Sequence, residues 1–278
     1  MHLLLCGHGY LGQAISRDFL QAGWRVTALS QSPRPSTTSG LSERVADLSS
    51  ASNIAEIALS LTQPDFIVHC ASSGRGGSDA YRSVYLDGTR HLLENFPETP
   101  LLFTSSSSVY AQTDGSLVTE TSPADPDRET GRILRAAEDQ VLSHRGYVFR
   151  LSGIYGPHRS FILKKFLSAE ATLEEDGRRI LNQIHRDDAA SAVLLAATSG
   201  LAPGIWNVSD SHPRSQRETF EGLAHLFDRP LPESAPRDPN RKRGWTHKQV
   251  SNAKLKAAGW KLRYPDFLDS ASLIAESL

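Results

Sequence analysis

The chain has 278 residues, of which 39% are hydrophobic and 22% are charged, and its formal net charge is −1. This composition is ordinary for a globular protein, and the near-neutral charge gives no electrostatic reason to expect nucleic acid or an anionic membrane as a partner. No apolar run approaches the roughly 18 residues of a membrane span, and the apolar start is too short for a signal peptide, so a cytoplasmic location is expected.

The first half of the chain alternates short apolar runs with amphipathic segments. The apolar runs predict six strands, at residues 2–6, 25–30, 44–48, 65–71, 100–106 and 147–153. The segments between them predict helices at residues 10–23, 51–62 and 79–96 and a long helix around Arg135. Strands that alternate with helices predict a parallel sheet with helices on both faces. The expected fold class is therefore α/β with a doubly wound, Rossmann-type sheet.

A glycine-rich motif joins the first predicted strand to the first helix. Gly7, Gly9 and Gly12 have the spacing G-x-G-x-x-G within GHGYLG. The first glycine permits a tight turn, the second lets a pyrophosphate approach the backbone, and the third lets the helix pack close to the strand. The phosphates would lie at the start of the helix that opens with Tyr10 and Leu11, because its N–H groups and dipole favour anions. Such a motif alone often marks only a turn, but between a strand and a helix it predicts a dinucleotide site.

The end of the second predicted strand indicates which dinucleotide binds. An acidic residue there would accept a hydrogen bond from the ribose 2′-hydroxyl of NAD. The chain instead has Ser30, Gln31, Ser32 and a nearby Arg34, and these hydroxyl, amide and guanidinium groups suit the 2′-phosphate of NADP. The same residues could simply form a solvated loop, so NADP is expected and NAD stays open. Asp47–Leu48, after the third strand, is expected to border the adenine.

Past residue 155 the alternation becomes irregular. The sequence predicts a helix at 187–199, a strand at 204–210 and a helix at 215–228. We therefore expect a dinucleotide-binding domain over residues 1–154, with residues 184–210 returning to it. Residues 155–278 are expected to form mainly a small C-terminal, substrate-binding lobe.

Seven segments along nearly the whole chain carry a family resemblance. They are GHGYLG (7–12), FIVHCAS (66–72), YLDGTRHLLE (85–94), FTSSSSVYA (103–111), VFRLSGIYGP (148–157), IHRDDAA (184–190) and SNAKLKAAGW (251–260). In these segments the chain resembles the extended short-chain dehydrogenases/reductases, the superfamily of sugar-nucleotide epimerases and dehydratases.

The resemblance implies roles for single residues. Ser106 falls where the family keeps its catalytic Ser or Thr. Further cofactor contacts are implied for Cys70, Ala71, Ser72 and Ser105, and for Ser152 and Ile154 near the nicotinamide carboxamide. Substrate contacts are implied for Ser107 and Ser108 and, at the outer end of the cleft, for His185 and Arg186.

The chain departs from the family at the acid–base pair, a Tyr followed four residues later by a Lys. Thr130 and Leu134 fall on these positions, and none of the seven tyrosines is followed by Lys at that spacing. Tyr85 stands where the extended family often has a catalytic Asn. We therefore expect an atypical member in which Ser106 is catalytic and Tyr85 helps to move protons, although a tyrosine on a helix is more often a packing residue.

Two functions follow as alternatives. The first is an NADP-dependent oxidoreductase or epimerase/dehydratase-like enzyme that acts on a small polar substrate, such as a sugar derivative, with nonstandard acid–base residues. The second is a catalytically silent NADP(H)-binding sensor or regulatory protein. No cluster of His, Cys and carboxylate residues has metal-ligand spacing, so no metal is expected. A homodimer stays open.

Overall fold

A computed structural model describes residues 1–32, 36–74, 76–237 and 245–278 of the chain, so Arg34 lies outside the described residues. The chain divides into two compact units. Unit 1 comprises Met1–Val109, Asp125–Arg150 and Ala190–Trp206, and unit 2 comprises Tyr110–Ala124, Leu151–Ala189 and Asn207–Leu278.

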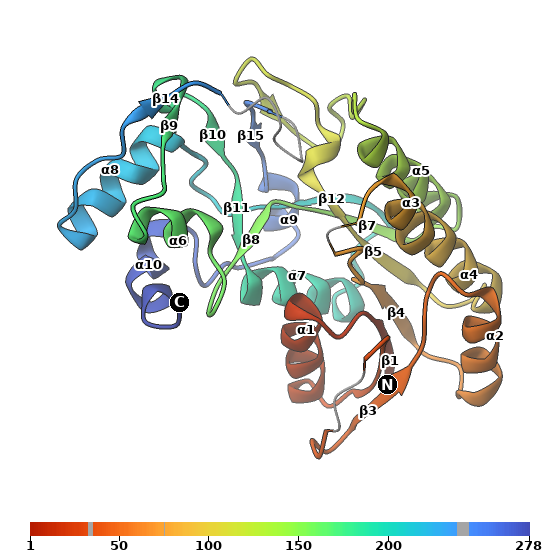
Figure 1. The fold of residues 1–278 in the computed structure, drawn as a ribbon. Coiled ribbons are helices and arrows are strands. Elements are labelled where there is room, and N and C mark those ends of the chain that lie inside the picture. The colour runs from red at the N-terminus through yellow and green to blue at the C-terminus, as the bar shows by residue number, and fades with distance from the viewer. Residues whose placement is uncertain (33–35, 75, 238–244) are drawn as a thin grey trace. The chain divides into compact units, whose positions relative to one another are not determined.

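A seven-stranded sheet lies for the most part in unit 1 (Figure 1). Its strands, in spatial order, are β12 (Gly204–Val208), β7 (Tyr147–Leu151), β5 (Leu101–Ser106), β4 (Phe66–His69), β1 (His2–Cys6), β2 (Arg25–Ser30) and β3 (Leu41–Val45). The pairs β1–β2, β1–β4, β2–β3 and β4–β5 are parallel. Helices cover both faces of the central strands, so these strands are mostly apolar and every residue of β1, β4 and β7 is buried, including the polar His2, His69 and Arg150.

The helices that cover this sheet form two layers (Figure 1). Helices α2 (Ala51–Ser60), α4 (Gly88–Asn95) and α5 (Glu129–Ser143) cover one face, and α1 (Tyr10–Gln21) and α7 (Arg186–Thr198) cover the other. This arrangement confirms the predicted doubly wound α/β fold. The chain builds β2 and β3 on one side of β1 and β4 and β5 on the other. In such sheets the carboxyl ends of the strands at this reversal form a crevice that binds ligands.

Two predicted elements differ most from the observed ones. The third strand spans residues 41–45 rather than 44–48, and beyond it Asp47 accepts hydrogen bonds from the backbone N–H and hydroxyl of Ser49 in a turn. The helix predicted at 79–96 consists of α3 (Ser78–Tyr81), a π-helical segment η1 (Arg82–Asp87) and α4. Near the C-terminus, β15 (Gln249–Val250) pairs with β6 (Leu117–Val118), and α9 (Ala253–Ala257) follows it.

Unit 2 has its own small core. Its helices α6 (Phe161–Leu167), α8 (Gln216–Phe227) and α10 (Phe267–Ala275) pack around a buried cluster that includes Phe166, Phe220 and Phe267. Its remaining strands are short, namely β8 (Gly153–Tyr155), β9 (Leu173–Glu174), β10 (Ile180–Leu181), β11 (Gln183–His185), β13 (Arg214–Ser215) and β14 (Ser234–Ala235). Among the described residues, no helix is long and apolar enough to cross a membrane.

Candidate functional site: a dinucleotide pocket and its surroundings

A cavity of about 800 Å³ lies in unit 1 beside the ends of β1, β2 and β4. Its volume is in the range of small-molecule and cofactor sites. Of the residues predicted to bind the cofactor, those that line it are Gly7, Gly9, Tyr10, Ser30, Gln31, Ser32, Asp47, Leu48, Ala71 and Ser72. The structure therefore brings together side chains that the sequence separates by up to 65 residues.

The three glycines of the motif have different reasons to be glycine. Gly7 has a φ of +109°, and a Cβ on it would lie 2.5 Å from the backbone of Ala71. A Cβ on Gly12 would lie 2.0 Å from the carbonyl oxygen of Gly7. Gly9, in contrast, has an ordinary φ of −86°, and a Cβ on it would meet nothing within 4 Å. Packing therefore requires Gly7 and Gly12, whereas the space at Gly9 is open to a ligand.

The start of α1 suits an anion. Gly9 is its N-cap, no side chain caps the helix there, and its first turn contains no acidic residue. Backbone N–H groups and the helix dipole at such an end attract phosphate. The open position at Gly9 and the helix end beside it fit the pyrophosphate of a dinucleotide.

Other predicted cofactor residues hold the pocket's framework instead of lining it. The thiol of Cys70 donates a hydrogen bond to the carbonyl oxygen of Gly7 at 3.1 Å. Burial raises the pKa of Cys70 to about 12, so this thiol stays neutral. Leu11 is buried in α1. These contacts fix the glycine-rich turn against β4.

Asp47 has a turn-forming role at the pocket's edge. Hydrogen bonds from Ser49 are the largest cause of a lowered pKa at Asp47, so its carboxylate is charged at neutral pH. Its neighbour Leu48 is buried and lies close to Gly88. A Cβ added to Gly88 would be 3.1 Å from the Cβ of Leu48.

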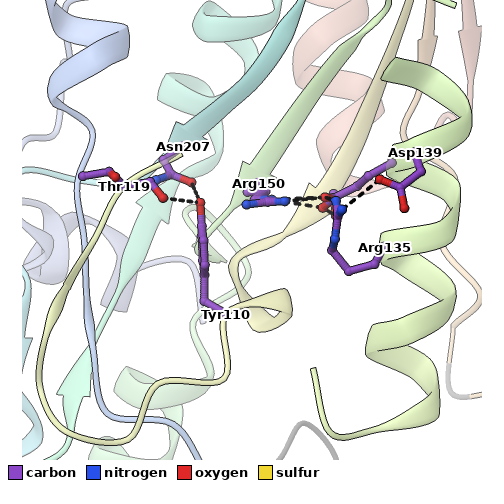
Figure 2. Close-up of polar contacts among 8 residues, drawn as sticks. Tyr110, Thr119, Arg135, Asp139, Arg150 and Asn207 are labelled. Carbon is purple, nitrogen blue, oxygen red and sulfur yellow. Dashed lines mark hydrogen bonds and ion pairs between the residues drawn. The ribbon is translucent and has the colours of Figure 1, made fainter. Parts of the chain in front are cut away.

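Ser105 belongs to a buried ionic cluster around Glu138. Its hydroxyl donates to the carboxylate of Glu138 at 2.5 Å. Arg150 and Arg135 both point at the same carboxylate, and Arg135 also binds Asp139 at 2.8 Å (Figure 2). Glu138 is fully buried and Arg150 is 1% exposed. The side chain of Ser105 is therefore used to join β5 to α5.

Ser106 is the last residue of β5, and its side chain is more exposed than that of Ser105. Its side chain is half-buried, and its hydroxyl oxygen accepts a hydrogen bond from the backbone N–H of Ser108 at 3.2 Å. This contact orients the oxygen and leaves the hydroxyl proton available for donation. Ser107 and Ser108 continue into a 3₁₀ turn that ends at Val109.

Tyr85 lies in the π-helical segment and is held on two sides. Its hydroxyl accepts from the backbone N–H of Ser73, a pocket residue, at 3.3 Å. Its ring stacks near His69, with ring centroids 6.3 Å apart. His69 is fully buried and lies 3.0 Å, through Nε2, from the carbonyl oxygen of Val84, which also lines the pocket. Burial lowers the pKa of His69 to about 4, so the ring is neutral and donates to that carbonyl.

The two positions of the missing acid–base pair lie on α5. Leu134 is 5% exposed and forms part of the apolar core, as expected for a side chain with no proton to exchange. Thr130 is half-buried and is followed by Gly131, where a Cβ would lie 2.5 Å from Pro126.

The remaining predicted residues lie in unit 2. Ser152 is buried, and Ile154 pairs with Ile184 in the β8–β11 ladder. His185 is 2% exposed and packs between two tyrosine rings, with centroid distances of 5.3 Å to Tyr155 and 3.8 Å to Tyr264. Beside it, Arg186 pairs with Asp187 at 3.0 Å. Elsewhere in this unit Figure 2 shows the hydroxyl of Tyr110 directed at Asn207 and at the carbonyl of Thr119, which indicates a structural role.

Eight residues that line the pocket were not predicted, and two of them, His8 and Glu43, have ionisable side chains; the other six are Gln13, Leu29, Ala46, Ser73, Ala80 and Val84. His8 lies inside the GHGYLG motif, so its position was visible in the sequence. Glu43 was not predicted because the third strand was expected to begin at residue 44, whereas it begins at residue 41. Glu43 therefore lay outside the predicted strand. Among the described residues, no group of three or more His, Cys, Asp or Glu side chains could hold a metal ion.

Comparisons with known proteins agree with this geometry. Residues 3–209 match the model of the NAD dependent epimerase/dehydratase family. Protein YeeZ of Escherichia coli K12 is 26% identical over 227 residues, which cover 75% of this chain and 78% of YeeZ. A candidate NAD-dependent epimerase/dehydratase from Methylobacillus flagellatus has a TM-score of 0.81 at 25% identity, with 99% of this chain and 97% of that chain covered. The UDP-glucose 4-epimerase of Thermus thermophilus, solved with NAD, has the same fold, with a TM-score of 0.82, 22% identity and coverage of 100% and 98%.

Proposed function

The chain belongs to the NAD dependent epimerase/dehydratase family, and from this premise we propose that it is an oxidoreductase or epimerase/dehydratase-like enzyme that binds NADP(H) in the unit 1 cavity. The observation that carries the proposal is the empty position beside Gly9, at the uncapped start of α1, within a cavity of about 800 Å³. Ser30, Gln31 and Ser32 line the same cavity and offer neutral hydrogen-bonding groups at the end of β2, where an acidic residue would disfavour a 2′-phosphate.

The substrate we propose is a small polar molecule, such as a sugar derivative. The solved Thermus thermophilus relative is a UDP-glucose 4-epimerase, which supports this class. Ser107, Ser108, His185 and Arg186 stay our candidates for substrate contacts, and Ser152 and Ile154 for the nicotinamide end of the cofactor. Their roles are inferred from the family motifs.

Side chains of this protein would then transfer the proton to or from the substrate. When bound, the nicotinamide supplies the hydride transfer. Ser106 has an oriented oxygen and a proton to donate. Tyr85 accepts from Ser73 and so also keeps its hydroxyl proton for donation. General acid–base help of this kind contributes roughly 10²–10⁴-fold to a rate.

Cofactor binding is tested by a matched pair of glycine variants. Gly9 and Gly77 are both helix N-caps with nearly the same backbone, φ −86° and ψ −153° against φ −84° and ψ −158°, and a Cβ on either meets nothing within 4 Å. Only Gly9 lines the cavity. We expect Gly9→Val to weaken NADPH binding at least about 100-fold in a fluorescence titration, since its side chain fills the pyrophosphate space, while Gly77→Val binds normally. Equal binding by both variants would place the phosphates elsewhere.

Turnover is tested separately, because a silent NADP(H)-binding sensor is the alternative function. In a screen of carbonyl compounds, alcohols and sugar nucleotides with NADP(H), we expect at least one substrate to be converted. Ser106→Ala and Tyr85→Phe should each lower that turnover at least about tenfold without changing NADPH affinity. Tight NADPH binding with no conversion across the screen supports the sensor instead.

A further inference from the structure

Two residues that line the cavity after β3, Asp47 and Leu48, are held by hydrogen bonds to their backbone groups. The backbone N–H of Asp47 donates to the side-chain oxygen of Asn53 at 3.3 Å, and its carbonyl oxygen accepts from the backbone N–H of Ser50 at 3.1 Å. The carbonyl oxygen of Leu48 lies 2.8 Å from Nδ1 of His91. The first two partners belong to the start of α2, whereas His91 belongs to α4 and is 43 residues further along the chain than Leu48.

The ring of His91 is enclosed, and both of its nitrogens make contacts. The residue is 3% exposed. A carbonyl oxygen can only accept, so Nδ1 carries a proton and donates it to Leu48. A guanidinium can only donate, so Nε2, which lies 3.0 Å from a nitrogen of Arg90, accepts. Arg90 is itself paired with Glu94 at 3.2 Å on the exposed side of α4. His91 therefore presents a fixed donor to the Leu48 carbonyl.

The Leu48 carbonyl has little room to move toward α4. Gly88 begins this helix, and a Cβ on it would lie 3.5 Å from the Leu48 carbonyl oxygen. Leu48 is itself 6% exposed, and a buried carbonyl without a donor is unfavourable. Without the Nδ1 donor of His91, this carbonyl would have to turn away from α4 to reach water, and the Leu48 side chain would move with it.

The position of Leu48 matters for the adenine end of the cofactor. In this fold the pyrophosphate lies at the glycine-rich turn and the adenosine ribose at the end of β2. Because β3 pairs with β2, the residues that follow β3 border the base beyond that ribose. We propose that His91 is a positioning residue for the cofactor, which holds the Leu48 carbonyl and thereby fixes the wall of the cavity against the adenine. The inference rests on the proposed dinucleotide function of this cavity.

The test uses two variants of nearly equal shape. Asn and Leu both branch at Cγ, but only Asn can place an N–H donor where Nδ1 of His91 lies. Both variants lose the contact with Arg90, so the difference between them reports on the hydrogen bond to Leu48. In a fluorescence titration, at a temperature where both variants are fully folded, we expect His91→Leu to weaken NADPH binding at least about fivefold and His91→Asn to stay within about twofold of wild type. His91→Met replaces His91→Leu if the latter does not melt cooperatively.

Fragments of the cofactor show which end of it is affected. ADP-ribose carries the adenine, so its affinity for His91→Leu should fall by about the same factor as that of NADPH. Nicotinamide mononucleotide lacks the adenine and should compete with NADPH equally well in wild type and in His91→Leu.

The outcomes separate this inference from the proposed function. If wild type binds NADPH and His91→Leu binds it equally well, the positioning role of His91 is wrong and the cofactor site stands. A loss in His91→Asn as large as that in His91→Leu also overturns the inference, and so does an equal loss for the two fragments, because the effect is then on the fold in general. If wild type binds neither NADPH nor ADP-ribose, the proposed function and this inference fail together.

Discussion

Two polar regions of unit 1 are built in opposite ways. Around Gly9 the backbone and polar side chains border a cavity of about 800 Å³. Around Glu138 one carboxylate is fully buried and accepts hydrogen bonds from Ser105, Arg135 and Arg150. Polar groups beside a cavity are available to a ligand, whereas the same chemistry without a cavity holds elements of the fold together.

Neighbouring serines make the contrast sharp. Successive side chains of a strand point to opposite faces, so Ser105 and Ser106 at the end of β5 have different surroundings. Ser105 is 5% exposed and bound to Glu138, while Ser106 is half-buried with its proton uncommitted among the described contacts. Two serines can therefore have different roles, and the role depends on which face of the sheet each side chain is on.

The largest effect is expected from breaking the buried cluster. Glu138→Ala leaves the guanidinium of Arg150 buried without this carboxylate, so the free energy of unfolding should fall by about 3–5 kcal/mol. Urea denaturation of wild type and variant measures this loss in the free energy of unfolding. Asp139→Ala is the control, because Asp139 binds the same Arg135 but its side chain is 62% exposed, and its loss should cost less than about 1 kcal/mol. Similar losses in both variants would contradict the contrast between buried and exposed partners.

A smaller effect is expected within the glycine-rich turn. In Gly12→Ala the new methyl group would lie 2.0 Å from the Gly7 carbonyl oxygen, and relieving that overlap should lower the free energy of unfolding by about 3 kcal/mol. In Gly9→Ala the same methyl group enters open space, so stability should change by less than about 1 kcal/mol. Thermal melts of the two variants make the comparison. A Gly9→Ala protein as unstable as Gly12→Ala would mean that the space at Gly9 is needed by the fold itself.

The smallest of the three effects concerns pH. Burial lowers the pKa of His69 from 6.5 to about 4 in the folded protein, so below pH 6.5 the unfolded chain binds the proton more readily. The contribution of the neutral His69 ring to the free energy of unfolding is fully present above pH 6.5, and it is lost as the pH falls toward 4. Between about pH 7 and about pH 4.5 the loss should be about 2 kcal/mol.

His69→Phe isolates this contribution from the other titrating groups. The variant is less stable overall because the hydrogen bond to Val84 is gone, but over the same pH range its stability should fall less steeply than that of wild type. Parallel pH profiles for the two proteins would show that His69 is not the buried neutral ring that supports the π-helical segment.

The order of strands and helices in unit 1 was predictable because local patterns carry it. Apolar runs separated by amphipathic segments predict a parallel sheet, and the turn at Gly7, Gly9 and Gly12 marks the cofactor end of it. The third strand was misplaced because its residues are only partly buried and have no continuous apolar run. The π-helical segment at Arg82–Asp87 was also unpredictable, since it coincides with a contact between Val84 and His69, which lies on β4.

The sequence by itself determined the fold class, the family and the position of the glycine-rich turn, since each depends on residues close together in the chain. Only the tertiary structure decided which polar groups face the cavity. It assigned Ser105 to a buried carboxylate, separated the packing glycines from the open one, and placed Glu43 against His8 across 35 residues of chain. The physical reason is that burial, charge neutralisation and free space depend on neighbours from other strands, which no local pattern specifies.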